Sequence, residues 1–426
     1  MLDIEEQLAH LRSRIARINR KFETRPDKAL LPTPPAPAPI SAARVFIEEW
    51  ASGEVIENEH GPYFQTEKVY QRHRRHGSAD IGALADLPRD FLSVLSDGEI
   101  TNAAPERWAF LDTETTGLAG GSGTYAFLIG VGRITRQGFH VRQFFMREYC
   151  EEKSLLLALS EHLQCFDVLI TYNGKTYDQP LLETRYRLAR QKPPFARLQH
   201  LDLLHGARRL WKLRFENCRL SYLENQVLGF ERDGDLPGEM IPYVYFEYLR
   251  SREAQRLVPI FHHNAIDILT LGCLTGIVPA AFRSTNHDSL LAAGVRRGEE
   301  ILGLGRWCVA ADDHERGLEL MKRAVDLGLP DVLLFRTLWD IARLEKKQGR
   351  CDAALAILRD LAQSRNEFRS KALEELAKHS EHTERNYALA LHFTHQALAL
   401  CQSEALQKRA ARLQQKLASA GTRGFF

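Results

Sequence analysis

The central part of the chain alternates between short apolar runs and helical patterns of apolar residues. Three runs rich in β-branched and aromatic residues, separated by turn residues, predict strands near 107–113, 124–134 and 138–147. The next segment has the spacing of an amphipathic helix, through Leu155, Leu156, Leu159 and Leu163. A further apolar run predicts a strand at 167–172, and helical patterns continue to about residue 280. This order predicts an α/β domain over 106–284, in which a mixed sheet is flanked by helices.

From about residue 288 the pattern is helical to the end of the chain. Ala354-Leu355-Ala356-Ile357 recurs as Ala388-Leu389-Ala390-Leu391, 34 residues later. This is the period of tetratricopeptide repeats, which are pairs of helices. We therefore predict an all-α helical-repeat domain over 288–420. Two roles stay open for it: a concave surface that binds a protein partner, or a cap on the preceding domain.

The first hundred residues divide into three segments. Residues 1–24 predict an N-terminal helix, whose apolar seam spans under three heptads and favours docking on the body of the protein. Residues 25–40 form a proline-rich linker. Residues 41–105 contain a predicted helix at 42–50 and a strand-like run at 61–70. They have too few apolar residues for a core of their own, so we expect this extension to pack on the 106–284 domain.

Composition limits the classes of partner. The 426 residues are 44% hydrophobic, which is enough for two or three cores, and the formal net charge is only +2. A field that is basic over the whole molecule is thus excluded, and attraction to nucleic acid must come from local patches. The candidate patches are basic runs at 72–76, 185–197 and 208–214, the last with Trp211 and Phe215 nearby to stack a base.

Cysteine usage and hydropathy favour a soluble cytoplasmic protein. The seven cysteines are scattered without a Cys-x-x-Cys pair, which argues against a zinc knuckle or a disulfide framework. No apolar run is expected to reach the length of a membrane span, and the N-terminus lacks the apolar region of a signal peptide. We therefore expect no association with a membrane.

Two carboxylates lie at the end of the first predicted strand of the central domain, in Phe110-Leu111-Asp112-Thr113-Glu114-Thr115-Thr116-Gly117. Residues i and i+2 of a strand project from the same face, so Asp112 and Glu114 should lie side by side. Their mutual repulsion destabilises the fold unless a cation occupies the gap. Divalent cations such as Mg²⁺ bind carboxylate oxygens, so the pair predicts a metal site.

Two later segments supply further ligands. Asp178 follows the strand at 167–172 after an Asn-Gly turn, at the start of a predicted helix. Asp267 lies in the helical segment that begins near Phe261, one turn after His263. If these segments converge on Asp112 and Glu114, the four carboxylates form a site for two metal ions, with a histidine beside it to take the proton of the attacking water.

These motifs resemble a known family. Asp-x-Glu-Thr-Thr-Gly, Asn-Gly-x-x-x-Asp and His-Asn-x-x-Asp, in this order, are similar to the three exonuclease motifs of the ribonuclease-H-like DEDD 3′→5′ exonucleases, and more narrowly to the YprB-type branch. The resemblance covers about residues 106–280 well. It implies a ribonuclease-H-like fold followed by tetratricopeptide-like helices. It also implies two Mg²⁺ or Mn²⁺ ions bound by Asp112, Glu114, Asp178 and Asp267.

The general base stays open between two adjacent histidines. In the family the base is a tyrosine four positions, or a histidine five positions, before the last aspartate, and here His263 lies at four and His262 at five. On a regular helix His263 shares the face of Asp267, whereas His262 is turned away by about 140°. The helical geometry favours His263, and the family's five-residue spacing favours His262.

Two functions follow as hypotheses. The first is a metal-dependent nuclease, a 3′→5′ exonuclease that hydrolyses DNA or RNA with two metal ions, and the complete set of carboxylates favours it. The second is a non-catalytic protein that binds nucleic acid or partner proteins through the same fold and helices. The sequence does not distinguish DNA from RNA or single strands from duplexes.

Overall fold

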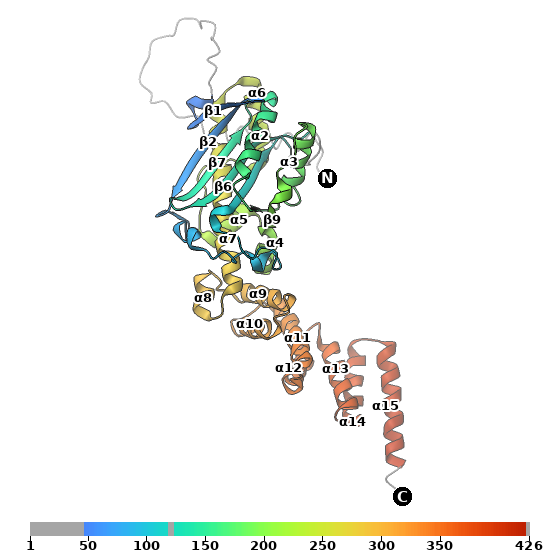
Figure 1. Cartoon of the computed structure of the whole chain (residues 1–426). Coiled ribbons are helices and arrows are strands. Elements are labelled where there is room, and N and C mark those ends of the chain that lie inside the picture. The colour runs from blue at the N-terminus through green and yellow to red at the C-terminus, as the bar shows by residue number, and fades with distance from the viewer. Residues whose placement is uncertain (1–46, 118–122, 423–426) are drawn as a thin grey trace, which may run out of the picture. The chain divides into compact units, whose positions relative to one another are not determined.

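The fold is built around one seven-stranded sheet (Figure 1). The computed structural model describes residues 47–117 and 123–422, so the predicted N-terminal helix and proline-rich linker lie outside the described residues. The strand order is β1-β2-β7-β6-β5-β8-β9. In that order the strands span Gly53–Asn58, Gly61–Gln71, Gly138–Phe145, Ala126–Thr135, Trp108–Thr115, Val168–Thr171 and Gln199–Asp202.

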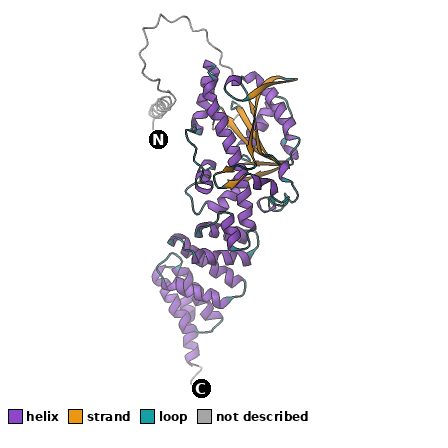
Figure 2. Ribbon diagram, turned by 90° about the vertical axis from the view of Figure 1, so that its left-hand side faces the viewer, coloured by secondary structure: helices purple, strands orange, loops and turns teal. Residues whose placement is uncertain are grey.

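The sheet is mixed, as predicted. Its β2, β7, β6 and β5 neighbours pair antiparallel, whereas β8 pairs parallel to both β5 and β9. The parallel strands need crossover helices, and these are α2 (Glu152–Leu163) and α3 (Asp178–Leu188). Figure 2 shows the strands among helices, followed by a part that is helical throughout. The predicted architecture, a mixed sheet flanked by helices with an all-α region after it, is confirmed.

Two strands of the seven-stranded sheet were not predicted. The extension at 41–105 contributes β1 as well as β2, and both continue the same sheet through the pairing of β2 with β7. At the other edge, β9 is only four residues long and three of them are polar, so it is too short for a clear period-two pattern. Of the helix predicted at 42–50, the described part is a short 3-10 turn, Ile47–Glu49. In the same extension β3 (Arg75–His76) pairs with β4 (Ala79–Asp80) in a separate two-stranded sheet.

Helix α7 (Val258–Arg283) packs across the sheet against β5, β6 and β7. It approaches closely because glycines face it: a Cβ on Gly130 would lie 2.2 Å from both Asn264 Oδ1 and Ile268 Cδ1. The segment Ala254–Arg283 is long and apolar enough to span a membrane. The expectation that no apolar run of the chain reaches that length was therefore wrong. The most apolar window of this segment is 72% buried inside the fold, as in a core helix, which explains why it is apolar on all sides.

Smaller helices cover the rest of the α/β domain. They are α4 (Leu203–Trp211), α5 (Leu220–Leu223), a π-helical turn at Glu224–Leu228, and α6 (Ile241–Ser251). Trp211 is fully buried in the core, so the expectation that it stacks a base is wrong. Arg185 is also buried, paired with Glu152 and stacked 3.7 Å over the ring of Tyr125, so it does not belong to an exposed patch.

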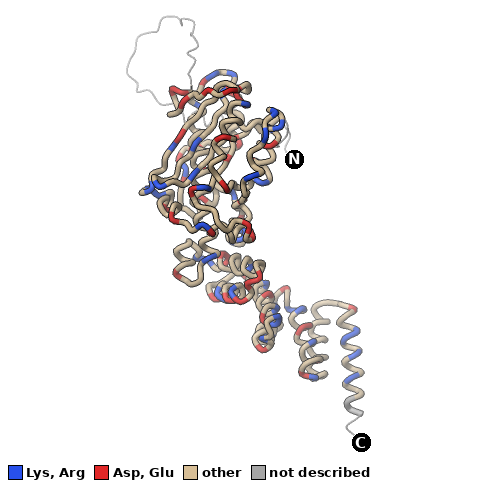
Figure 3. The backbone as a smooth tube through the Cα atoms, viewed as in Figure 1, with Lys and Arg blue, Asp and Glu red and all other residues tan. Residues whose placement is uncertain are grey.

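The C-terminal part consists of helices α8 to α15. They span His287–Ala292, Gly298–Ala310, His314–Asp326, Asp331–Lys347, Cys351–Gln363, Arg369–His382, Tyr387–Leu400 and Glu404–Thr422. One hydrophobic core runs from the sheet through α7 into α9 and α10, and a second lies among α11 to α15. Charged residues of both signs are interspersed along the described parts of the chain, in accord with its small net charge (Figure 3).

Candidate metal centre

Strand β5 carries the first two acidic residues of the candidate site. The strand is buried through Leu111, and from Asp112 onward buried and partly exposed positions alternate. Asp112 and Glu114 therefore share the less buried face, as the period of a strand requires. The register with β6 shifts between Glu114 and Thr115, so the regular pairing ends just where the carboxylates are presented.

The turn between β8 and α3 carries Asp178, the first residue of α3. Asn173 has a left-handed φ of 67°, and its backbone N–H donates to Asp202 Oδ1 at 2.8 Å. A Cβ on Gly174 would lie 2.5 Å from the side chain of Thr171, so this tight turn requires glycine. At its end, Thr113 Oγ1 donates to Asp178 Oδ1 at 2.5 Å, which joins the turn to β5.

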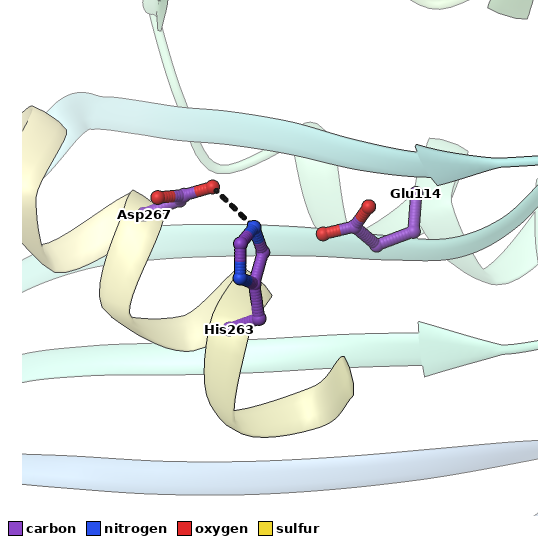
Figure 4. Close-up of side chains that lie close together, drawn as sticks. All are labelled: Glu114, His263 and Asp267. Carbon is purple, nitrogen blue, oxygen red and sulfur yellow. Dashed lines mark ion pairs between the residues drawn. The ribbon is translucent and has the colours of Figure 1, made fainter. Parts of the chain in front are cut away.

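Helix α7 supplies His263 and Asp267, one turn apart. Nε2 of His263 lies 3.3 Å from Asp267 Oδ2, and Nδ1 lies 2.9 Å from both carboxylate oxygens of Asp235. The imidazole is thus held between two carboxylates. Figure 4 shows His263 and Asp267 on the helix, facing Glu114 on the strand. One ligand atom from each of these three residues lies within 4.8 Å of the other two.

Electrostatics show that the four predicted carboxylates influence one another. Burial, and then the charges of Asp267, Glu114 and Asp178, raise the pKa of Asp112 well above its usual range. Burial raises the pKa of Glu114 to about 8, and that of Asp178 to about 6. These carboxyl groups lie in surroundings that disfavour negative charge.

In Asp267 and His263, unlike the other three carboxyl groups, contacts with charged partners outweigh burial and stabilise the charged form. Burial would raise the pKa of Asp267, but its contacts with His263 and Arg232 hold that pKa below its usual value. Burial would lower the pKa of His263, but the hydrogen bonds with Asp235 and Asp267 raise it to about 11. His263 is therefore a cation inside the acidic cluster.

Three residues that sequence reasoning missed complete the site. Asn264, fully buried, donates from Nδ2 to Asp112 Oδ2 at 2.9 Å, and its own Oδ1 accepts from Gln143 of β7 at 2.9 Å. Asp235 holds His263. Arg232 donates from Nη2 to Asp267 Oδ1 at 2.5 Å and also contacts Glu224 and Asp235. Asn264 stands within the His-Asn-x-x-Asp motif, so the motif contained a signal for it.

His262, the alternative base, is placed differently. Its side chain is exposed, and burial of part of the ring together with the charge of Lys68 lowers its pKa. Within the described residues, its ring has no hydrogen bond with any of the four carboxylates. The structure thus turns His263, and not His262, toward Asp267.

Comparison with known proteins agrees with this fold. A profile of the RNase_H superfamily matches residues 109–277, which include all of the residues predicted for the site. The chain is 33% identical, over 318 residues, to the uncharacterized protein YprB of Bacillus subtilis (strain 168). The alignment covers 73% of this chain and 75% of that relative. The chain belongs to the YprB family, within the RNase H superfamily. Because that relative is itself uncharacterized, membership of the YprB family establishes the fold and leaves the reaction to be argued from the site.

The donor set fits a divalent cation. Carboxylates are the protein ligands that Mg²⁺ and Mn²⁺ prefer, and Asp112, Glu114, Asp178 and Asp267 offer carboxylates from three separate segments of the chain. The raised pKa values of three of them mean that added positive charge would stabilise their ionised forms. The chemistry of these residues is therefore that of a site for hard cations.

Proposed function

We propose that the protein is a metal-dependent nuclease that hydrolyses phosphodiester bonds of DNA or RNA from the 3′ end. The observation that carries this proposal is the convergence of Glu114, His263 and Asp267, with the charges of Asp112 and Asp178 acting on the same cluster. Membership of the RNase H superfamily supports it, because hydrolytic nucleases are common in that superfamily. The exonuclease direction rests on the resemblance of the three motifs to the DEDD enzymes.

The four carboxylates would hold two Mg²⁺ or Mn²⁺ ions. Bound there, the ions would supply activation of the attacking water and stabilisation of the leaving oxygen. Asn264 positions Asp112 through its hydrogen bond, and Arg232 positions Asp267 in the same way. Thr113 positions Asp178.

His263 is protonated in the metal-free protein, because the surrounding carboxylates raise its pKa to about 11. It is the proposed proton acceptor of the metal-loaded site, where cations bound to those carboxylates would lower its pKa and leave Nε2 without a proton. Asp235 contacts Nδ1 and sets the orientation of the ring, so that Nε2 is directed toward Asp267 and Glu114. Nε2 is thus the atom that would take the proton from the attacking water. Asp235 is a positioning residue in this arrangement.

The test uses the full chain with 5′-labelled single-stranded DNA and RNA, each with Mg²⁺, with Mn²⁺ or with EDTA. We expect products that shorten from the 3′ end, only with a divalent cation. Asp112→Ala should reduce the rate of hydrolysis by at least about 10³. The substitution removes a proposed ligand of the metal ions, and the attacking water is then no longer held in position. Asp352→Ala, which removes an exposed carboxylate on α12, is the matched control and should leave the rate unchanged.

Two results would contradict the proposal. Equal activity of Asp112→Ala and the parent protein would assign the hydrolysis to a contaminant or to another site. Binding of the oligonucleotides without hydrolysis under any of these conditions would favour the second hypothesis, a non-catalytic protein that uses this fold to bind nucleic acid.

A further inference from the structure

A polar groove lies next to the turn that carries Asp178. This cavity, of about 700 Å³, is bounded by the end of β8, by α4 and by the loop that leads to α5. We call it the α4 groove. Residues that the argument uses are Tyr172, Asn173, Arg208, Lys212, Glu216 and Arg219, all of which line it.

The groove carries three cations without an acidic partner. Arg208, Lys212 and Arg219 are exposed, and none of them forms an ion pair with any residue in the parts of the chain that the structure describes. Glu216 is the one acidic residue among the lining residues. Arg208 and Lys212 are four positions apart at the end of α4, so they lie on the same side of the helix. The groove is thus a row of available positive charge.

Neighbouring cations of the same segment have structural partners instead. Arg214 donates to Glu300 of α9 at 2.5 Å and stacks 4.6 Å over the ring of Phe215. Arg209 lies 5.3 Å over the ring of Trp307. The basic run at 208–214 is therefore divided between residues that attach α4 to the helical region and residues that remain available for a ligand.

The groove adjoins the candidate metal centre. Tyr172 and Asn173 line it and begin the turn that ends at Asp178. Asp202, which accepts the backbone N–H of Asn173, lies close enough for its charge to raise the pKa of Asp178. A ligand in the groove therefore lies next to one side of the carboxylate cluster.

We propose that the α4 groove binds the phosphate backbone of a single nucleic-acid strand whose end lies in the carboxylate cluster. The proposal rests on the proposed nuclease function. Single strands bind along grooves that combine positive charge with aromatic and apolar surface, and here Arg208, Lys212 and Arg219 stand beside Tyr172 and Leu204. An acidic polypeptide is the alternative ligand, and the position of the groove beside the nuclease site favours the nucleic acid.

The test measures binding separately from hydrolysis. Fluorescence anisotropy of labelled single-stranded oligo(dT) and oligo(U) is followed with the full chain in EDTA, at several salt concentrations. The test variant is Arg208→Gln/Lys212→Gln/Arg219→Gln. The control variant, Arg359→Gln/Arg365→Gln/Arg385→Gln, removes the same charge from exposed positions in the C-terminal helical region. Circular dichroism and thermal melting verify that both variants are folded.

We expect the groove variant to bind at least about tenfold more weakly than the parent protein, with a slope of log affinity against log salt that is shallower by about 2. Each phosphate contact to a single strand contributes about 0.7 to that slope, and three contacts are lost. The control variant should bind as the parent does. Three results would overturn the proposal. In the first, the groove variant binds as the parent does. In the second, both variants lose the same affinity. In the third, polyglutamate at equal charge concentration displaces the oligonucleotide.

These outcomes are distinct from those of the hydrolysis test. If the parent protein hydrolyses nucleic acid and the groove variant binds and hydrolyses equally well, the α4 groove proposal fails and the nuclease proposal stands. If the parent protein shows no hydrolysis but the groove variant loses binding selectively, the nuclease proposal fails and the groove is a nucleic-acid site of a non-catalytic protein.

Discussion

At the scale of single residues, two carboxylates determine the orientation and the charge of His263. Asp235 contacts Nδ1 and Asp267 lies beside Nε2, whereas the adjacent His262 is exposed. Both histidines stand on the same helix and differ by one position. Their different surroundings come from the direction in which α7 faces the sheet, and they provide an internal comparison for mutagenesis.

His263→Ala should lower the rate of hydrolysis by roughly 10²–10⁴, the usual contribution of a positioned general base. His262→Ala should have a much smaller effect, because its ring is turned away from the cluster. Single-turnover hydrolysis of labelled DNA measures the rate, and isothermal titration with Mn²⁺ measures how much metal binding is retained. A larger loss in His262→Ala would assign the base to the five-residue spacing, and equal small losses would show that neither histidine is the base.

At the scale of elements, the site depends on how closely α7 approaches β5 and β6. Gly130 pairs with Asp112 across β5 and β6 and lies under Asn264 and Ile268 of the helix. A side chain at this position would separate the helix from the sheet. Asn264 reaches Asp112 because Gly130 leaves room for it.

Gly130→Ala should therefore lower the free energy of unfolding by about 1–3 kcal/mol, the usual effect of overpacking a core, and should also lower activity, because the hydrogen bond from Asn264 to Asp112 is disturbed. Urea unfolding and the nuclease rate measure the two effects. Gly238→Ala is the matched control, since a Cβ there meets nothing within 4 Å. If Gly130→Ala were as stable and as active as Gly238→Ala, the close approach of α7 would not be needed for the site.

At the scale of the whole molecule, the buried ionisable groups connect stability to pH and to metal binding. The pKa of Glu114 rises from 4.5 to about 8, that of Asp178 from 3.8 to about 6, and that of His263 from 6.5 to about 11. Each group keeps its proton to a higher pH in the folded protein than in the unfolded chain. The folded state thus binds more protons between these values, and its stability falls as the pH rises through them.

We expect the melting temperature of the metal-free protein to fall as the pH rises from about 5 to about 9. The lowered pKa of Asp267 does not oppose this fall in melting temperature. The stability that its ionised carboxylate contributes is lost only as the pH falls below about 4. Mg²⁺ or Mn²⁺ should raise the melting temperature most at the high end, where the carboxylates are ionised and available as ligands. Differential scanning calorimetry in EDTA and in either metal measures both trends. A melting temperature that rises with pH in EDTA, or one that neither metal changes, would contradict this account.

The core of the molecule also extends beyond the predicted domain boundary. The hydrophobic cluster that contains Phe110 and Ile268 continues into Leu302 and Trp307 of α9, and Glu300 of that helix holds Arg214. Helices α9 and α10 therefore share a core with the sheet, α12 to α15 have a second cluster, and α11 contributes to both, through Ile341 and Ala342. The predicted division of the chain near residue 288, and the tetratricopeptide character of its last third, stay predictions.

The sequence by itself determined what depends on local periodicity. Alternating and apolar runs were sufficient to predict a mixed sheet with helices, because the spacing of apolar residues decides which face of an element is buried. The same rule indicated that Asp112 and Glu114 share a face of a strand, and that His263 and Asp267 share a face of a helix. The short edge strand β9 was missed, since four residues carry too little pattern.

Only the tertiary structure decided which of these faces meet and which groups surround them. Arg232 and Asp235 contact Asp267 and His263 across about 30 residues of chain, and Asn264 reaches Asp112 across 152. No period in the sequence encodes contacts of that length, because they depend on strand order and on the close approach of α7. Likewise, packing against α9 decided that Arg209 and Arg214 hold the fold together while Arg208 and Lys212 stay available to a ligand.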